Sequence, residues 1–294
     1  MKSLLFIYNP HAGKKRIVQR LHDVVYLFTT AGYTVTVHPT LFRGDATKTA
    51  AELGRQYDHV VCCGGDGTLN EVVTGLLAHP EEMPTLGYLP AGTTNDFSKT
   101  LKLPANLMRA AQIAVEGSPC PCDLGEFNGR PFIYVAAFGV FSEVSYATPQ
   151  NSKNVLGHLA YVLGGIKSLA QLKPCHMKVT HDGETLEGDF IYGMVSDSVS
   201  VGGFRGLKEK DVKLDDGLFE VMLVKNPRTP EELSTILNAL MKKQPDGNVI
   251  GFQSADISFS AEHPVAWTLD GEFGGDMETV RVCNRPRAIR IMRG

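Results

Sequence analysis

The chain has 294 residues, of which 43% are hydrophobic and 21% are charged, and its formal net charge is -3. This length accommodates two compact domains, and the composition is that of an ordinary globular protein. The nearly balanced charge excludes a protein adapted to a polyanion, so we expect no nucleic-acid partner.

The chain contains no segment typical of a secretory leader or a membrane span. The apolar run at residues 4–8 is too short for a leader, so we expect a first strand there. The most apolar long segment, residues 156–172, includes His158 and Lys167. We therefore expect a cytoplasmic protein that associates with membranes only transiently.

Residues 1–122 alternate between apolar runs and helix-period segments, which predicts an α/β domain with a parallel sheet. The predicted helices cover residues 17–28 and residues 107–114, the second preceded by Asn106 as a cap and followed by Gly117. The predicted strands are residues 4–8, 33–38, 60–63 and 86–89.

Residues 123–294 predict a second, β-rich domain, an antiparallel sandwich, with the alternative that its C-terminal tail packs back on the first domain. We expect helices near residues 155–172 and 230–243, and a ligand cleft between the two domains. The predicted strands are residues 132–141, 177–180, 190–196, 219–224, 257–259, 266–269, 280–282 and 289–292.

Residues 64–70, with the sequence GGDGTLN, form the strongest local motif. Their glycines allow main-chain amides to approach a ligand, and the helix that follows adds its positive end, so the pattern indicates a phosphate cradle. Asp66 among phosphates would be repelled unless a divalent metal lay between them, which makes it a candidate magnesium ligand. A plain glycine-rich turn remains the alternative.

Two further loops follow predicted strands, at residues 9–13 (NPHAG) and at residues 89–97 (LPAGTTNDF). The carboxyl ends of parallel strands share one edge of a sheet, so we expect these loops to converge with the glycine-rich loop. The basic residues 14–16 are interpreted as a solvated first turn, with a phosphate contact as the alternative. The Walker and dinucleotide-binding glycine patterns do not occur.

The pairing of the motif at residues 64–68 with residues 90–97 resembles the diacylglycerol kinase catalytic domain family, which includes bacterial soluble lipid kinases and sphingosine kinases. Residues 213–218 (KLDDGL) resemble the magnesium-binding loop of the bacterial members, and residues 269–275 (LDGEFGG) resemble their catalytic loop. Ala91 and Thr94 depart from the family pattern without removing a charged group.

The resemblance implies an ATP-dependent lipid kinase with Mg²⁺, and it implies a set of site residues. The implied ATP contacts are Asn9, Pro10, His11, Ala12, Gly13, Thr40, Gly64, Gly65, Asp66, Gly67, Thr68, Leu69, Asn70 and Thr93. The implied ligands of a structural magnesium are the carboxylate of Asp216 and the main-chain carbonyls of Lys213 and Leu218. Without the resemblance, residues 215–217 indicate a hairpin turn, and a turn is compatible with a cation site.

The resemblance also implies a mechanism in which Glu272 takes the proton of the acceptor hydroxyl. The carboxylates expected in the catalytic site are Glu272, Asp66, Asp270, Asp96 and Asp123. An exposed turn is the alternative interpretation of residues 270–272.

The expected acceptor is diacylglycerol, reached at the membrane surface, and homodimerisation is an expectation at the level of the family. Residues 155–172 are a candidate wall of the lipid slot, with an ordinary core helix as the alternative. A basic tail containing the arginines at 285, 287, 290 and 293 would favour anionic membranes, or it forms a solvent-facing strand edge. The competing functions are an NAD kinase-like enzyme and a non-catalytic nucleotide- or lipid-binding regulator.

Overall fold

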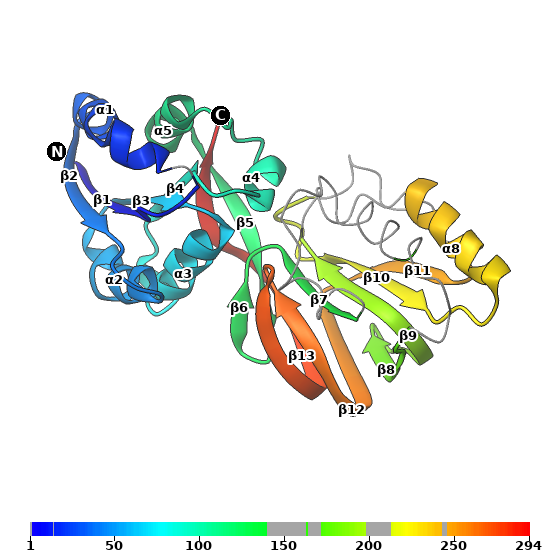
Figure 1. Cartoon of the computed structure of the whole chain (residues 1–294). Helices are drawn as coiled ribbons and strands as arrows, with labels where there is room; N and C mark the ends of the chain where they lie inside the picture. The colour runs from blue at the N-terminus through cyan, green and yellow to red at the C-terminus, as the bar shows by residue number, and fades with distance from the viewer. Residues whose placement is uncertain (1, 14, 140–162, 164–171, 198–212, 243–245) are drawn as a thin grey trace. The chain divides into compact units, whose positions relative to one another are not determined.

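The computed structural model describes the chain except for residues 1, 14, 140–162, 164–171, 198–212 and 243–245. Two compact units make up the chain: residues 1–122 with 287–294 form the first, and residues 123–286 form the second. The last residues of the chain, red in Figure 1, thus belong to the same unit as the N-terminus.

The first unit contains a parallel sheet in the order β13-β4-β3-β1-β2, which confirms the predicted α/β architecture. Its central strands β1, β3 and β4 are buried on both faces because α1 and α5 lie on one face and α2 and α3 on the other (Figure 1). The elements are β1 (Lys2–Tyr8), α1 (Arg16–Thr30), β2 (Tyr33–Pro39), α2 (Asp45–Leu53), β3 (His59–Gly64), α3 (Asp66–Leu76), β4 (Thr85–Pro90), α4 (Asp96–Thr100) and α5 (Leu107–Glu116).

Local sequence explains the start of α5 and the buried face of α1. Asn106 caps α5 as predicted, because its side chain accepts a hydrogen bond of 3.0 Å from the main-chain N–H of Arg109. On α1, Ile17, Val24 and Phe28 recur at helical spacing and are buried against the sheet. Two short 3-10 turns, Gly54–Gln56 and Pro80–Glu82, precede β3 and β4.

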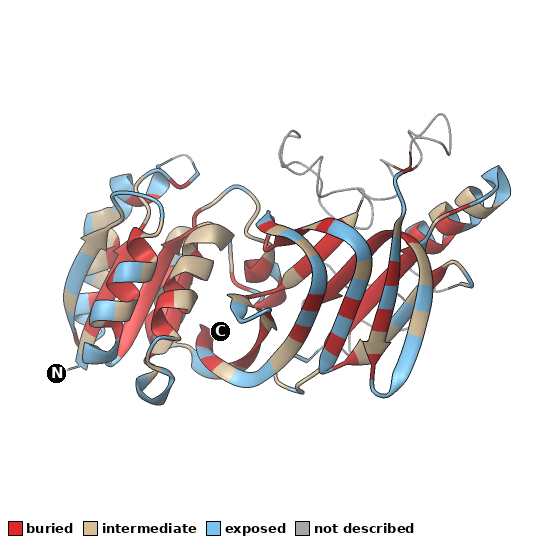
Figure 2. Ribbon diagram, turned by 90° about the horizontal axis from the view of Figure 1, so that it is seen from below, coloured by how far each residue is buried: buried red, intermediate tan, exposed pale blue. Residues whose placement is uncertain are grey.

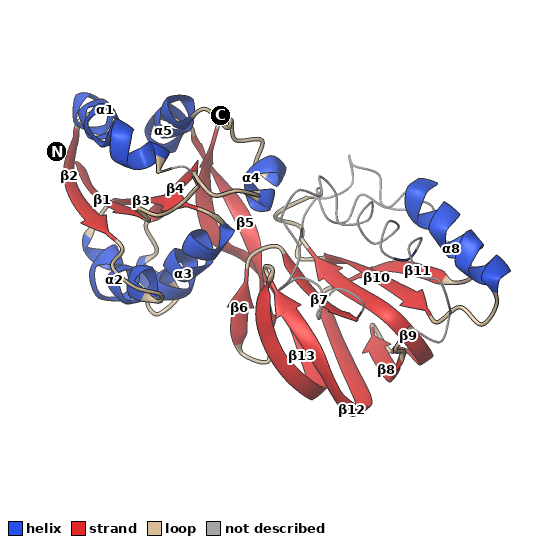
Figure 3. Cartoon of the chain, in the orientation of Figure 1, coloured by secondary structure: helices blue, strands red, loops and turns tan. Residues whose placement is uncertain are grey.

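The second unit is built mainly of antiparallel strands, which confirms the predicted β-rich architecture. Figure 3 shows strands dominating this part of the chain, with α8 beside them. The elements are β5 (Ser118–Phe127), β6 (Arg130–Phe132), β7 (Val135–Gly139), β8 (Cys175–His181), β9 (Glu184–Ser196), β10 (Phe219–Lys225), α8 (Pro230–Lys242), β11 (Val249–Ser254), β12 (Asp256–Leu269) and β13 (Glu272–Arg293).

An aromatic cluster around Trp267 forms the core of the second unit. The ring of Trp267 lies 4.8 Å from that of Phe138 and 5.1 Å from those of Phe127 and Phe259, measured between centroids. Along β12 and β13 buried and exposed residues alternate, which appears as red and blue bands in Figure 2. One face of each strand therefore packs on the core and the other meets solvent.

The structure corrects several strand predictions. The strand predicted at residues 132–141 is interrupted between β6 and β7, because the main-chain N–H groups of Ile133 and Tyr134 bind the carboxylate of Asp270 instead of a neighbouring strand. Residues 140–141 lie outside the described part. The strands predicted separately at 257–259 and 266–269, and at 280–282 and 289–292, are continuous within β12 and β13. The elements α2, α4, β5 and β11 were not predicted.

Two expectations that concern membranes can be compared with the structure. Within the described residues, no helix is both long enough and apolar enough to cross a bilayer. The helix expected near residues 155–172 lies almost entirely outside the described part.

The expected basic tail is the end of strand β13. Arg285 forms an ion pair with Glu126, and Arg293 donates to the main-chain oxygen of Leu101 at 3.2 Å.

Candidate active site

The order of the parallel strands places a topological switch point between β1 and β3. From β1 the chain goes to β2 on one side, and it returns through α2 to β3 on the other side. The loops at the carboxyl ends of β1 and β3 therefore leave in different directions from neighbouring strands. Such a switch point is where ligands bind in open α/β sheets.

The glycine-rich loop follows β3 and begins α3. A Cβ atom on Gly64 would lie 2.5 Å from the side chain of Thr68, so the close turn requires glycine. Gly65 precedes the helix, and the first main-chain N–H groups of α3 have no partner within the helix. The N-terminus of a helix that follows such a turn is suited to binding an anion.

The loop after β1 lies against both other loops. The N–H of Asn9 donates to the main-chain oxygen of Cys63 at 2.9 Å, and its side-chain amide lies 3.4 Å from the hydroxyl of Thr68. At the far end of the loop, Gly13 has a φ of +53°, and a Cβ there would lie 2.3 Å from the carbonyl oxygen of Ala91. Only glycine fits this contact.

The loop after β4 closes the arrangement. The N–H groups of Ala91 and Gly92 both donate to the carbonyl oxygen of Gly64, at 2.8 and 3.2 Å. A Cβ on Gly92 would lie 2.5 Å from the Cα of Gly65, so the two backbones are as close as glycine allows. The structure thus brings together the three loops that the sequence placed at strand ends.

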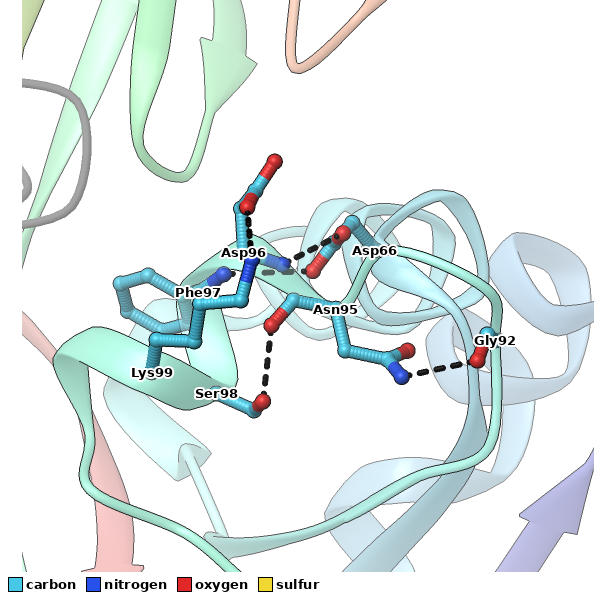
Figure 4. Close-up of polar contacts among 7 residues, drawn as sticks. All are labelled: Asp66, Gly92, Asn95, Asp96, Phe97, Ser98 and Lys99. Atoms are coloured by element: carbon cyan, nitrogen blue, oxygen red, sulfur yellow. Dashed lines mark hydrogen bonds and ion pairs between the residues drawn. The ribbon is translucent and has the colours of Figure 1, made fainter. Parts of the chain in front are cut away.

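Asp66 connects the glycine-rich loop to the loop after β4 (Figure 4). Its carboxylate accepts hydrogen bonds from the main-chain N–H groups of Asp96 at 2.9 Å and Phe97 at 3.4 Å. Asp96 itself forms an ion pair of 2.7 Å with Lys99. These hydrogen bonds join the first turn of α3 to the start of α4.

The remaining predicted nucleotide contacts differ in how far their side chains are exposed. Thr40 follows β2, and its N–H donates to the main-chain oxygen of Tyr8 at 2.9 Å, so it lies at the same edge of the sheet. Thr93 is exposed on the loop after β4. The side chains of Leu69 and Ala12 are buried in the hydrophobic core, so only the main chain of these two residues is available to a nucleotide.

In the second unit, Asp270 and Gly271 form a two-residue turn between β12 and β13. Their φ angles of +50° and +84° are those of the tight turn favoured by Asp-Gly. The carboxylate of Asp270 accepts from the N–H groups of Ile133 at 2.7 Å, Tyr134 at 2.9 Å and Val135 at 3.1 Å. These bonds fix the turn, so Asp270 positions its neighbours. Glu272, two residues after Asp270, is exposed.

Asp123 braces the turn at residues 214–217. It is fully buried, its carboxylate accepts from the N–H of Gly217 at 2.6 Å, and its own N–H donates to the carbonyl of Leu214 at 2.6 Å. Asp216 is exposed, and one of its oxygens accepts from the N–H of Leu218 at 3.1 Å. Lys213 precedes the turn and is exposed.

The sequence did not indicate two other acidic residues near this turn. Asp197 and Glu220 are 1% and 3% exposed. Burial raises the pKa of Asp197 well above its ordinary value, reinforced by the negative charges of Glu220 and Asp123. Burial also raises the pKa of Glu220 to about 7. A signal for Glu220 existed, since it is the one charged residue in the apolar run FEVMLV of β10.

The predicted residues therefore form two groups. The first unit holds the nucleotide candidates together with Asp66 and Asp96, and the second unit holds Asp123, Asp216, Asp270 and Glu272. Among the described residues, no three carboxylate, imidazole or thiol groups could by themselves hold a metal ion. A cation would therefore need main-chain carbonyls or water to complete its ligands.

Comparison with known proteins identifies the family. Residues 3–127 match the model of the diacylglycerol kinase catalytic domain, and residues 135–293 match that of the YegS C-terminal NAD kinase beta sandwich-like domain. The diacylglycerol kinase of Bacillus subtilis (strain 168) is 37% identical over 278 residues, which are 94% of this chain and 91% of that protein. The diacylglycerol kinase of Staphylococcus saprophyticus is 35% identical over 94% of this chain and 90% of its own length.

The fold agrees with a solved structure. The crystal structure of a diacylglycerol kinase from Bacillus anthracis str. Sterne superimposes with a TM-score of 0.77 at 24% identity, covering 100% of this chain and 97% of that one. Two matching domain models and long, similar relatives lead to one conclusion. The chain belongs to the diacylglycerol kinase family of lipid kinases.

Proposed function

We propose that this chain transfers the γ-phosphoryl group of ATP to the free hydroxyl of diacylglycerol, giving phosphatidic acid and ADP. The observation that carries the proposal is the convergence of three loops at the carboxyl edge of the parallel sheet. Their contacts require glycine at Gly13, Gly64 and Gly92, and Gly64 lies just before α3, whose first main-chain N–H groups have no partner within the helix. Such a site suits the phosphates of a nucleotide.

The chemistry proposed for the second unit depends on the turn at residues 270–271. During transfer, the hydroxyl oxygen of the lipid bonds to the γ-phosphorus, the bond from that phosphorus to the bridging oxygen of ADP breaks, and the hydroxyl proton moves to the carboxylate of Glu272. Asp270 supports this role because its three main-chain hydrogen bonds hold the turn that carries Glu272.

The residues present also fit magnesium. In the first unit, Asp66 would hold the ion that accompanies the phosphates, with Asp96 as a supporting carboxylate. In the second, the carboxylate of Asp216 and the carbonyls of Lys213 and Leu218 would hold a structural ion, on a turn that Asp123 braces. When bound, magnesium neutralises negative charge, while the loops themselves bind and orient the nucleotide.

The acceptor is a lipid, so we propose that the chain works at a membrane surface. The test is the transfer of label from γ-labelled ATP to diacylglycerol, monoacylglycerol, ceramide and sphingosine in mixed micelles, with NAD assayed in parallel. Label in diacylglycerol supports the proposal. Label in another lipid alone would reassign the acceptor, label in NAD alone would favour an NAD kinase-like enzyme, and nucleotide binding without any transfer would favour a regulator.

A further inference from the structure

Asp197 lies in a fixed position at the end of β9. Its N–H donates to the carbonyl of Tyr134 at 3.1 Å, and the hydroxyl of the preceding Ser196 donates to the same oxygen at 2.9 Å. The residue is 1% exposed, yet neither oxygen of its carboxyl group has a hydrogen-bond donor in the part of the chain that the structure describes. These two hydrogen bonds thus anchor the backbone at a buried carboxyl group that has no donor among the described residues.

Glu220 lies beside it on the next strand. Glu220 on β10 pairs with Ser196 on β9 and is 3% exposed. One of its carboxyl oxygens is 3.3 Å from the side-chain amide of Gln253, and the other has no donor among the described residues. Glu220 also follows the turn at residues 214–217 directly, since β10 begins at Phe219.

The electrostatic surroundings of Asp197 are acidic. The charges acting most strongly on it are those of Glu220, Asp123, Asp216 and Asp215. Burying a carboxyl group without a donor or a cation is unfavourable, and adding like charges increases the free-energy cost. Packing alone does not explain why these acidic residues lie near Asp197 in the second unit. A divalent cation would compensate all of these charges together.

We propose that Asp197 and Glu220 extend the cation site at residues 213–218, so that their carboxyl groups bind a divalent cation either directly or through an ordered water. This inference rests on the structural magnesium in the proposed function and adds two residues to it. Asp123 has a different task, because its carboxylate bonds to the N–H of Gly217 and shapes the turn.

The coordination that this implies is mixed. Since no three metal-binding side chains in the described part could hold an ion alone, main-chain carbonyls of the turn and water would supply the remaining oxygens. Hard cations such as Mg²⁺ and Ca²⁺ accept ligands of this kind. The buried carboxyl groups would act mainly by adding negative charge and by orienting bound water, as outer partners do in other metal sites.

The test measures cation binding without nucleotide or lipid, so that its failure is separate from any failure of kinase activity. The full-length chain is titrated with MgCl2 by calorimetry, and its thermal unfolding is followed with and without Mg²⁺. The variants are Asp197→Asn and Glu220→Gln, with Asp216→Asn as a positive control. Asp256→Asn is the matched negative control, because Asp256 is a carboxylate of the same unit paired with Arg281 on the surface.

We expect Mg²⁺ to raise the Tm of the unsubstituted chain, and Asp197→Asn and Glu220→Gln to weaken Mg²⁺ binding by about 10- to 100-fold. Without metal, Asp197→Asn should be at least as stable as the parent, because it removes an uncompensated buried carboxyl group. A parent chain that does not respond to Mg²⁺, or variants that respond as the parent does, would overturn the inference. If one variant fails to fold, the other decides.

Discussion

The carboxylate of Asp66, at the start of α3, accepts a hydrogen bond of 2.9 Å from the main-chain N–H of Asp96, at the start of α4. This bond joins the loop after β3 to the loop after β4, at the edge of the sheet where a nucleotide is expected to bind (Figure 4). Asp66 therefore has a structural task whether or not it also binds magnesium.

Asp66→Asn should reduce turnover by about 100-fold, since an amide keeps one acceptor oxygen but loses the charge and shifts the loop after β4. Steady-state kinetics with ATP and diacylglycerol would measure the change. Asp23→Asn is the control, because Asp23 forms an exposed ion pair with Arg20 on α1 and such pairs contribute little. Equal rates for Asp66→Asn and the parent would contradict the assignment.

Gly92→Ala should weaken ATP binding by at least about tenfold, the effect of a loss of 1.4 kcal/mol in binding free energy. The added methyl group would lie 2.5 Å from the Cα of Gly65, so the two loops must separate. Titration calorimetry with a non-hydrolysable ATP analogue would measure the affinity. Gly247→Ala serves as the control, because a Cβ there meets open space. Unchanged affinity in Gly92→Ala would show that the loop contact is dispensable.

Asp270→Asn should destabilise the second unit by about 1–3 kcal/mol, because its NH2 group would face a main-chain N–H that now donates to a carboxylate. The chain offers a matched control in Asp182→Asn. Asp182 and Gly183 form a similar turn between β8 and β9, with φ angles of +46° and +82°, but the Asp182 side chain is 60% exposed. Denaturant unfolding would measure both variants, and equal losses would refute the anchoring role of Asp270.

The first unit should lose stability as the pH falls below the ordinary histidine pKa of 6.5, because burial lowers the pKa of His59 below that value. Between the two pKa values the unfolded chain binds more protons than the folded one, so protonation favours unfolding. His59→Gln keeps a donor for the carbonyl of Ala114, which His59 contacts at 2.7 Å, and removes the titration. Denaturation at about pH 7.5 and about pH 5.5 should show a smaller loss in the variant. An identical loss would place the titrating group elsewhere.

The sequence predicted the parallel sheet and its three loops because local chemistry determines them. A glycine-rich turn after a strand has few possible shapes, and the carboxyl ends of parallel strands must meet at one edge. The expectation for Asp66 was incomplete, since the N–H groups it binds belong to a loop 30 residues away.

The sequence did not predict the features that depend on contacts between residues far apart in the chain. The predicted strand at residues 132–141 is interrupted because the N–H of Ile133 binds Asp270, 137 residues away. Asp197 and Glu220 become neighbours only through the pairing of β9 with β10, and no local pattern brings them together. Residues that act through such pairings can be found only when the register of the sheet is known.

The central claim is tested most directly by measuring label transfer from γ-labelled ATP to diacylglycerol by the parent chain and by Glu272→Gln, side by side in mixed micelles with Mg²⁺. We expect label in the lipid with the parent, a fall in turnover of roughly two to four decades with the variant, and unchanged ATP binding in both. No label in diacylglycerol with the parent, or undiminished turnover with Glu272→Gln, would contradict it.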